Sequence, residues 1–259
     1  MADEAAAILA DRLETGLVVV PEGGAAPRAR TLRCLRGSHP VPSEASRTAG
    51  ETVLEAAAGA GSGSLVIVLL SGGASSLAVA PSPGLTLSDL QDVTSRLLAS
   101  GAEIGAVNTV RRHCSRLKGG GILRAASRAA GVWTLALSDV IGDDPAAIGS
   151  GPTVSDPTTF AEAAAVLRRW APAARSAVRD QIEAGVRGLR PETVKPGDAL
   201  LAQAAFVIVG SNAVAVDAMA GAAADAGYAV VRTERPLTGD AGAEGAAFAR
   251  MLRDLPAET

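Results

Sequence analysis

Three segments of the sequence carry residues that suit the binding of anions and metal ions. The first, residues 71–76, reads Ser-Gly-Gly-Ala-Ser-Ser and follows a short apolar run at residues 65–70. Its small side chains leave backbone N–H groups open to an anionic oxygen, and its serines add hydroxyl donors. It lacks the lysine of a Walker A loop and does not match the G-x-S-x-G elbow of serine hydrolases. A tight strand-to-helix turn that needs glycine for a positive φ is the alternative reading.

The second segment, residues 138–145, places three carboxylates at the end of another apolar run. Asp139, Asp143 and Asp144 offer oxygen ligands only, and Mg²⁺ together with phosphate oxygens relieves the repulsion between clustered carboxylates. Alternatively, Asp143 and Asp144 cap a turn before Pro145. The turn at residues 149–153 follows closely and could form a further wall of the same site.

The third segment is a predicted helix over residues 104–117 that runs into Lys118 and three glycines. Beside its apolar stripe, helical spacing predicts one row of polar and cationic side chains, which suits recognition of a carboxylate or phosphate. A solvated basic face is the alternative, although solvated helices seldom end in three glycines. The row consists of Asn108, Arg111, Ser115 and Lys118.

The chain has two histidines. His39 lies in a Gly-Ser-His-Pro segment, where a turn role and a site role both remain open. His113 lies on the predicted helix, and its position favours a packed or solvated histidine over a catalytic one. The spacing gives no support to a triad of Ser75, a histidine and Asp139.

Short apolar runs predict strands, and Ala/Leu-rich segments of helical length lie between them. Strands that are apolar throughout and alternate with helices favour a doubly wound, Rossmann-like α/β fold, with a mostly parallel sheet and helices on both faces. Ligands bind such sheets at the carboxyl ends of the strands, where the first two segments lie. Strands are expected at residues 16–20, 32–35, 65–70, 132–137, 205–209 and 228–232, and helices at residues 3–14, 43–58, 88–100, 104–117, 120–130, 159–170, 173–188 and 212–226.

The composition argues against nucleic-acid binding and membrane association. The 259 residues carry 24 basic and 27 acidic side chains and six aromatic ones, so a nucleic-acid partner is not expected. The longest apolar run is far too short to cross a bilayer, and the first residues lack the pattern of a signal peptide, so we expect a cytoplasmic protein without a membrane partner. Cys34 and Cys114 are expected to be free thiols. Only Lys118 and Lys195 among the basic residues are lysines.

Eight segments, in order along nearly the whole chain, resemble the amino-terminal domain of the type II glycerate kinases, whose members were also labelled hydroxypyruvate reductases. The resemblance implies one α/β domain over residues 1–259. It also implies transfer of the γ-phosphoryl group of ATP to D-glycerate, giving 2-phosphoglycerate, with Mg²⁺ in a cleft between two domains. The matching segments are residues 37–42, 71–77, 108–113, 117–120, 137–145, 150–157, 209–212 and 237–241.

The resemblance also implies roles for the residues above. Lys118 and Arg111 would clamp the transferred charge. Asp139, Asp143 or Asp144 would hold Mg²⁺, or one of them, with Asp139 the catalytic candidate, would accept the hydroxyl proton of glycerate. Substrate and phosphate oxygens would be bound by ten small or polar residues: Ser71, Gly72, Gly73, Ser75, Asn108, Gly119, Gly120, Ser150, Gly151 and His39.

The sequence also departs from the family pattern. It lacks an initial strand-loop ending in Gly-Lys-Ala and a second domain, so the resemblance implies a chain truncated at both ends. Ala74 and Gly121 replace a more usual Gly and Arg. The alternative function is therefore a catalytically incomplete fragment that acts as a binding or partner domain, and a homodimer could replace the missing wall. A nicotinamide-dependent reductase is a third reading, but no G-x-G-x-x-G follows a predicted strand.

Overall fold

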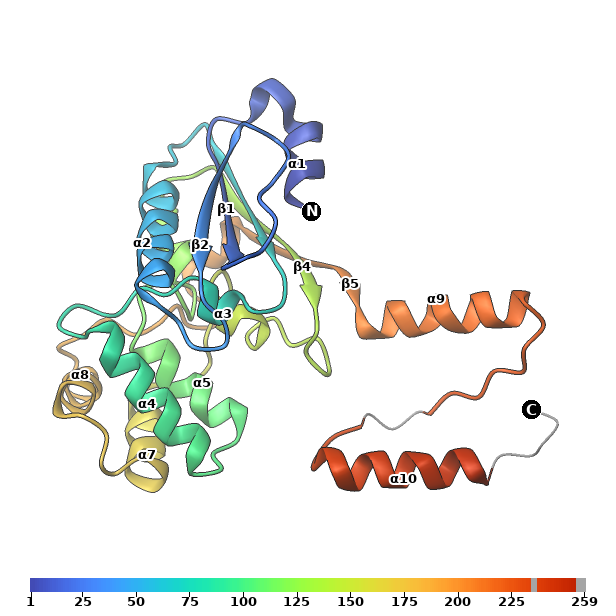
Figure 1. Cartoon of the computed structure of the whole chain (residues 1–259). Coiled ribbons are helices and arrows are strands. Elements are labelled where there is room, and N and C mark those ends of the chain that lie inside the picture. Colours follow the sequence, from blue (N-terminus) through green and yellow to red (C-terminus); the bar gives the residue numbers. More distant parts are fainter. Residues whose placement is uncertain (234–236, 255–259) are drawn as a thin grey trace. The chain divides into compact units, whose positions relative to one another are not determined.

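The computed structural model describes residues 1–233 and 237–254, and it divides into two compact units, Met1–Val209 and Gly210–Thr259 (Figure 1). The first unit contains all three segments singled out above. No helix in the described part of the chain is long and apolar enough to cross a membrane.

Within the described residues, five strands form two sheets, and the β1–β2 and β3–β4 ladders are parallel. β1 (Gly16–Pro21) pairs with β2 (Leu32–Gly37), while β3 (Leu65–Leu70) pairs with β4 (Gly131–Ser138), whose other side is taken by β5 (Ala204–Ser211). Helices lie on both sides, so the parallel α/β fold predicted from the sequence is confirmed. Because β3 and β4 run in the same direction, the segments after Leu70 and after Ser138 leave the sheet at the same edge.

The strand expected at residues 228–232 is wrong. These residues form no regular element, and Tyr228, Val230 and Val231 are exposed. The N–H of Tyr228 bonds the carbonyl oxygen of Ala223, at the end of α9, and no strand of the described chain pairs with the segment. A β-branched run therefore stays irregular where no neighbouring strand supplies hydrogen bonds.

Local capping explains where several helices begin. Thr86 and Thr159 each form a capping box with the residue three positions later, which fixes the first turns of α4 and α7.

The sequence analysis predicted neither α3 nor α10. The helices are α1 (Ala2–Leu9), α2 (Glu44–Gly59), α3 (Ala74–Leu77), α4 (Leu87–Ala99), α5 (Ile104–His113), α6 (Gly121–Ala125), α7 (Phe160–Trp170), α8 (Ser176–Val186), α9 (Asn212–Asp225) and α10 (Ala241–Arg253), with 3₁₀ turns η1 (Ala10–Arg12), η2 (Ile148–Ser150) and η3 (Ala199–Gln203).

The helix expected over residues 104–117 ends at His113. The predicted row of polar side chains on one helix face is therefore wrong for its last two members, Ser115 and Lys118. Ser115 pairs with Pro81 in an isolated antiparallel bridge, and its hydroxyl accepts the N–H groups of Leu117 and Lys118. Ser115 and Lys118 therefore lie in a turn rather than on the face of α5 that carries Asn108 and Arg111.

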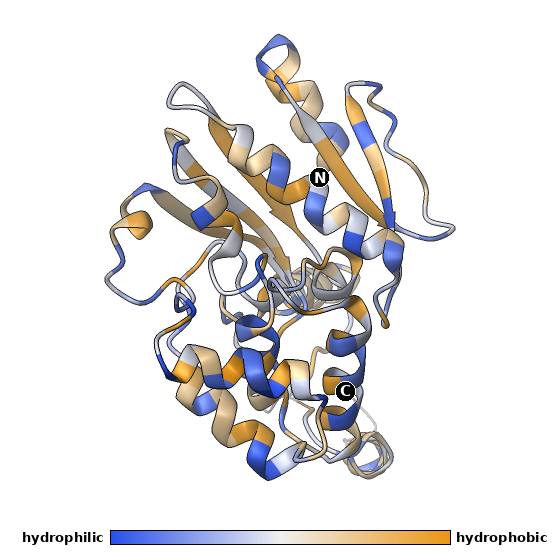
Figure 2. Cartoon of the chain, turned by 90° about the vertical axis from the view of Figure 1, so that its left-hand side faces the viewer, coloured by the Kyte–Doolittle hydropathy of each residue, from blue (hydrophilic) through white to orange (hydrophobic). Residues whose placement is uncertain are grey.

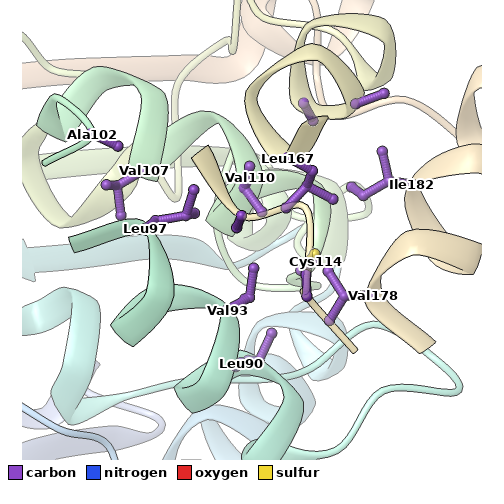
Figure 3. Packing of buried hydrophobic residues seen from close by; sticks show 14 of the residues in the cluster. Leu90, Val93, Leu97, Ala102, Val107, Val110, Cys114, Leu167, Val178 and Ile182 are labelled. Atoms are coloured by element: carbon purple, nitrogen blue, oxygen red, sulfur yellow. The ribbon is translucent and has the colours of Figure 1, made fainter. Parts of the chain in front are cut away.

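The main core of the first unit lies among α4, α5, α7 and α8. Figure 3 shows Val93 and Leu97 from α4 facing Val107 and Val110 from α5, with Leu167 on their far side. Burying each such side chain contributes roughly 1.5–3 kcal/mol, so this cluster fixes the position of α5.

A second cluster joins α2 and α6 to β3 and β4, through Leu54, Leu123 and Val132 among others. Figure 2 shows apolar strands running through the unit between helices that carry hydrophilic and hydrophobic residues on different sides. A third, smaller cluster of Leu70, Ala136 and Ile148 packs near the carboxyl ends of β3 and β4. The loops after these strands therefore rest on a packed base.

Candidate functional site

The loop after β3 lies close to two other predicted site residues, Asp139 and His39. Gly73 has φ 84° and caps α3, and its carbonyl oxygen accepts the N–H groups of Ser76 and Leu77. A Cβ on Gly72 would lie 2.9 Å from Oδ2 of Asp139, and a Cβ on Gly73 would lie 3.2 Å from Cδ2 of His39. The two glycines thus leave room for a carboxylate and an imidazole close to the loop backbone.

Two cationic side chains converge on one carbonyl oxygen of this loop. Nζ of Lys118 donates a 2.7 Å hydrogen bond to the carbonyl oxygen of Ser75, and Nη2 of Arg111 donates one of 3.0 Å to the same atom. The two charges predicted to act together are therefore neighbours, although a turn and not a continuous helix carries Lys118.

Hydroxyl and amide groups join this pair. The hydroxyl oxygens of Ser75 and Ser150 lie 2.7 Å apart, and Ser150 donates to Oδ1 of Asn108 at 3.2 Å. Nη1 of Arg111 also donates to Oδ1 of Asn108, at 3.3 Å. Five predicted site residues from three separate segments thus form one hydrogen-bonded network, which we call the Ser75 network.

Two glycine-rich turns hold Ser150 and Lys118 in place. The N–H of Gly119 bonds the carbonyl oxygen of Ser150 at 3.1 Å, and the N–H of Gly120 bonds that of Gly151 at 2.7 Å. Ser150 has φ 64° and is fully buried between Gly149 and Gly151, which also have positive φ. A side chain at Gly120 would meet Val194 at 2.4 Å, so the close approach of these segments depends on glycine there.

The network contains more positive charge than its protein partners balance. Lys118 is only 3% exposed, and no carboxylate in the described part of the chain lies within 4 Å of Lys118 or Arg111. Burial lowers the pKa of Lys118 well below its usual value, and the nearby charges of Arg111 and Arg112 lower it further. Burial also lowers the pKa of Arg111. Such a site favours an anionic ligand.

The three predicted metal ligands do not form one cluster. Asp139 is exposed beside Gly72, whereas Oδ1 of Asp144 accepts the N–H of Ala146 and caps the following turn. Asp143 has φ 53° in that turn. Within residues 1–233 and 237–254, no group of three or more His, Cys, Asp or Glu side chains is placed to hold a metal ion.

His113 is a packed helix histidine, as the sequence favoured. It is 2% exposed, its Nδ1 lies 2.8 Å from the carbonyl oxygen of Thr109, and its Nε2 lies 3.1 Å from Oε2 of Glu192. Its ring meets Phe160 edge to face. His39, by contrast, is exposed beside Gly73.

A recess of about 590 Å³ opens near Arg116, Arg124 and Arg190. Of the predicted site residues, only Lys118 and Gly119 line it, whereas the Ser75 loop and Asp139 do not. Lys118 therefore lines this recess and also bonds the Ser75 loop, whereas Asp139 lies outside the recess.

Sequence reasoning missed a buried ion pair next to the network. Nη1 of Arg112 lies 3.0 Å from Oδ1 of Asp156, and both side chains are almost fully buried. Arg112 lies on the same side of α5 as the buried Thr109 and His113. An arginine on a buried helix face requires a partner, and this signal could have indicated an acidic residue elsewhere.

Comparisons with known proteins place this geometry in context. A family model described as a domain of unknown function (DUF4147) matches residues 1–183. A protein of Agrobacterium vitis with the provisional name hydroxypyruvate reductase is 43% identical over 227 residues, which cover 88% of this chain and 50% of that protein. The glycerate 2-kinase of Pyrococcus horikoshii is 34% identical over 241 residues, which cover 92% of this chain and 53% of that enzyme.

The structural comparison agrees. The crystal structure of glycerate kinase from Thermotoga maritima matches with a TM-score of 0.78 and 32% identity, covering 88% of this chain and 52% of that one. The chain thus spans about half the length of these relatives.

Proposed function

The chain belongs to the DUF4147 family of type II glycerate kinases, and we propose that the protein transfers the γ-phosphoryl group of ATP to D-glycerate, with 2-phosphoglycerate as the product. Residues 1–259 are assigned to the amino-terminal α/β domain of such an enzyme. The relatives named as kinases are about twice as long as this chain, so the activity of the whole enzyme is proposed for a chain that covers about half of their length.

One observation supports this function above the others. Lys118 and Arg111 both bond the carbonyl oxygen of Ser75, and no described carboxylate balances their charges. A carboxylate or phosphate placed beside this carbonyl would supply the missing negative charge. In phosphoryl transfer, protein groups mainly position the reactants and neutralise charge, which is what two buried cations at a fixed carbonyl can do.

The remaining residues of the network would orient these cations. Asn108 accepts hydrogen bonds from Arg111 at 3.3 Å and from Ser150 at 3.2 Å, and the hydroxyl of Ser150 lies 2.7 Å from that of Ser75. Nζ of Lys118 has two further N–H donors that no described protein atom takes, and these could bind an oxygen of glycerate or phosphate. Ser71, Gly72 and Gly73 would contribute backbone donors from the adjacent loop.

The carboxylate segment fits Mg²⁺ in part. Asp139 is an exposed oxygen donor beside the loop, and Asp144 keeps one carboxylate oxygen free of its turn. Mg²⁺ commonly takes one or two protein carboxylates together with water and substrate phosphates, so this donor set is sufficient. When bound, the ion would neutralise phosphate charge. Asp139 or Asp144 would hold it together with water and phosphate oxygens, and Asp139 is the alternative acceptor of the glycerate hydroxyl proton.

Two other functions remain to be tested against this one. The chain could act as a binding or partner domain of the family without turnover. Two relatives carry the name of a reductase, but the sequence has no dinucleotide-binding glycine motif after a strand.

The decisive experiment is a coupled ADP-release assay on the purified, folded chain with D-glycerate, ATP and Mg²⁺. Glycerate-dependent ADP release that is lost in Lys118→Met supports the kinase. Release without glycerate dependence, or an equal rate in Lys118→Met, contradicts it. Oxidation of NADH or NADPH by hydroxypyruvate in the same preparation would favour the reductase. Binding of glycerate or ATP without turnover would favour the partner domain.

A further inference from the structure

The buried pair of Arg112 and Asp156 lies where three segments of the site meet. Arg112 follows Arg111 on α5, and its Nη2 donates a 2.8 Å hydrogen bond to the carbonyl oxygen of Ala146, in the turn that leads to Ser150. The stem of Arg112 also packs beside Gly119, where a Cβ would lie 3.4 Å from Cβ of Arg112. One side chain therefore touches the helix, the Ser150 turn and the Lys118 turn.

Asp156 completes this arrangement from the other side. Its Oδ1 accepts hydrogen bonds from Arg112 and from the N–H and hydroxyl of Thr158, and its Oδ2 accepts one from Thr193. Its own N–H bonds the carbonyl oxygen of Val194, and the N–H of Val194 bonds that of Gly119. The Lys118–Gly120 turn is thus held between Ser150 and Gly151 on one side and Val194 on the other.

From this geometry we infer that Arg112 and Asp156 are positioning residues, whose ion pair fixes the Ser150 and Lys118 turns against α5 so that the Ser75 network can form. The inference rests on the proposed function for its activity readout. Neither side chain hydrogen-bonds a member of the network, so both would act on it through the turns that they hold.

If the pair served stability alone, replacing both residues together would leave the activity unchanged. Removing one member of a buried ion pair strands a charge, whereas removing both charges together is often neutral for stability. A pair that only stabilises the fold could therefore be replaced without loss of function. A pair that positions the turns could not, because the hydrogen bond from Arg112 to Ala146 would be lost as well.

The test is the double variant R112M/D156N of this chain. Met fills the volume of the arginine stem, and Asn keeps hydrogen-bonding atoms for Thr158 and Thr193. We expect a folded protein in which kcat falls on the order of 100-fold, as small displacements of positioned groups can cause. We also expect amide hydrogen exchange at Gly119 and Gly120 to accelerate about 10-fold, since these N–H groups bond Ser150 and Gly151.

A matched control removes another pair of the same types. Arg96 and Asp92 lie 2.9 Å apart on α4, so R96M/D92N should leave both readouts unchanged. If R112M/D156N does not fold, Arg112→Lys is the second variant. It keeps the positive charge but replaces the guanidinium by an ammonium group, which cannot bond Asp156 and Ala146 in the same geometry. Its kcat and its amide exchange at Gly119 and Gly120 are then measured.

The outcomes separate this inference from the proposed function. A folded R112M/D156N protein with wild-type exchange at Gly119 and Gly120 overturns the positioning role. If the wild-type protein releases no ADP with glycerate, the kinase assignment fails, and the exchange rates alone then decide whether the pair fixes the turns.

Discussion

Nζ of Lys118 donates a 2.7 Å hydrogen bond to the carbonyl oxygen of Ser75, across 43 positions of sequence. Arg111 reaches the same oxygen from α5. A carbonyl oxygen carries only a partial negative charge. It accepts a hydrogen bond from each side chain but does not neutralise their positive charge. This relationship joins the loop after β3 to the Lys118 turn, and most of the expected consequences of mutation follow from it.

Substituting Lys118 by Met should abolish most activity without unfolding the domain. Met fills a similar volume, but it removes the buried hydrogen-bond donor that an anionic substrate would meet, and we expect kcat to fall by about 10²–10³-fold. Lys195→Met is the matched control, because the only other lysine bonds Thr158, Thr193 and Glu192 outside the network. Steady-state ADP release measures both variants. A wild-type rate in folded Lys118→Met would remove this lysine from the site.

The pH dependence of stability should also identify Lys118. Its folded-state pKa is lowered by burial and by the adjacent arginines, so between that pKa and the ordinary value of about 10.4 the unfolded chain binds more protons. The free energy of unfolding attributable to Lys118 therefore rises with pH in this window, at up to about 1.4 kcal/mol per pH unit. Urea unfolding of wild type and Lys118→Met over a pH series measures it. A difference between the two proteins that does not change with pH would contradict the shift.

The sequence was sufficient for the fold class because its strongest signals are local. The runs at residues 65–70 and 132–137 are apolar on both faces, and they became the paired strands β3 and β4. The run at residues 228–232, Tyr-Ala-Val-Val-Arg, also contains β-branched residues but has no partner strand, and pairing is a long-range property that no local window contains. α5 likewise ends four residues early, because the bridge between Ser115 and Pro81 is a tertiary contact.

The candidate site was predicted in its residues but not in its geometry. Glycine and serine types after a strand suggested the Ser75 loop, yet the helical spacing that grouped Lys118 with Arg111 was the wrong reason for their proximity. The actual reason is the 119–120 turn bonding to residues 150–151, which are far away in sequence. Asp156 was part of a matching segment but had no assigned role, because only the folded chain brings it to Arg112.

The two cysteines should differ sharply in reactivity. Cys114 is fully buried in the core of α4, α5, α7 and α8, and burial, together with the nearby Asp89, raises its pKa to about 12. Cys34 is only half-buried. Because the thiolate is the reactive form, a thiol reagent at pH 8 should modify one cysteine per folded chain. Cys34→Ser should then show none until the protein is denatured, and two reactive thiols in the native state would contradict the packing of Cys114.

Gly72→Ala should disturb Asp139 more than the fold. The new Cβ would lie 2.9 Å from Oδ2 of Asp139, an exposed terminal atom that can move aside, so stability should change by no more than about 1 kcal/mol. If Asp139 holds Mg²⁺, the Mg²⁺ concentration for half-maximal activity should rise in Gly72→Ala and in Asp139→Asn alike. Asp180→Asn, at an exposed aspartate of α8, is the control. Unchanged metal titrations in both variants would return Asp139 to a structural role.

Ser150 is the position where backbone strain and hydrogen bonding can be separated. At φ 64° a non-glycine residue costs roughly 1–2 kcal/mol relative to glycine. Ser150→Gly removes this strain together with the hydroxyl, whereas Ser150→Ala removes the hydroxyl and keeps the strain. Both variants lose the bonds to Ser75 and Asn108, so both should lose activity to a similar extent, about 10-fold or more.

The two Ser150 variants should nevertheless differ in stability. Thermal or urea unfolding should place Ser150→Gly about 1 kcal/mol above Ser150→Ala. Equal stabilities would mean that the left-handed conformation is not retained in the variants. Wild-type activity in Ser150→Gly would mean that the hydroxyl does not orient the network, and the function of the turn would then be limited to holding Gly119 and Gly120 through its backbone.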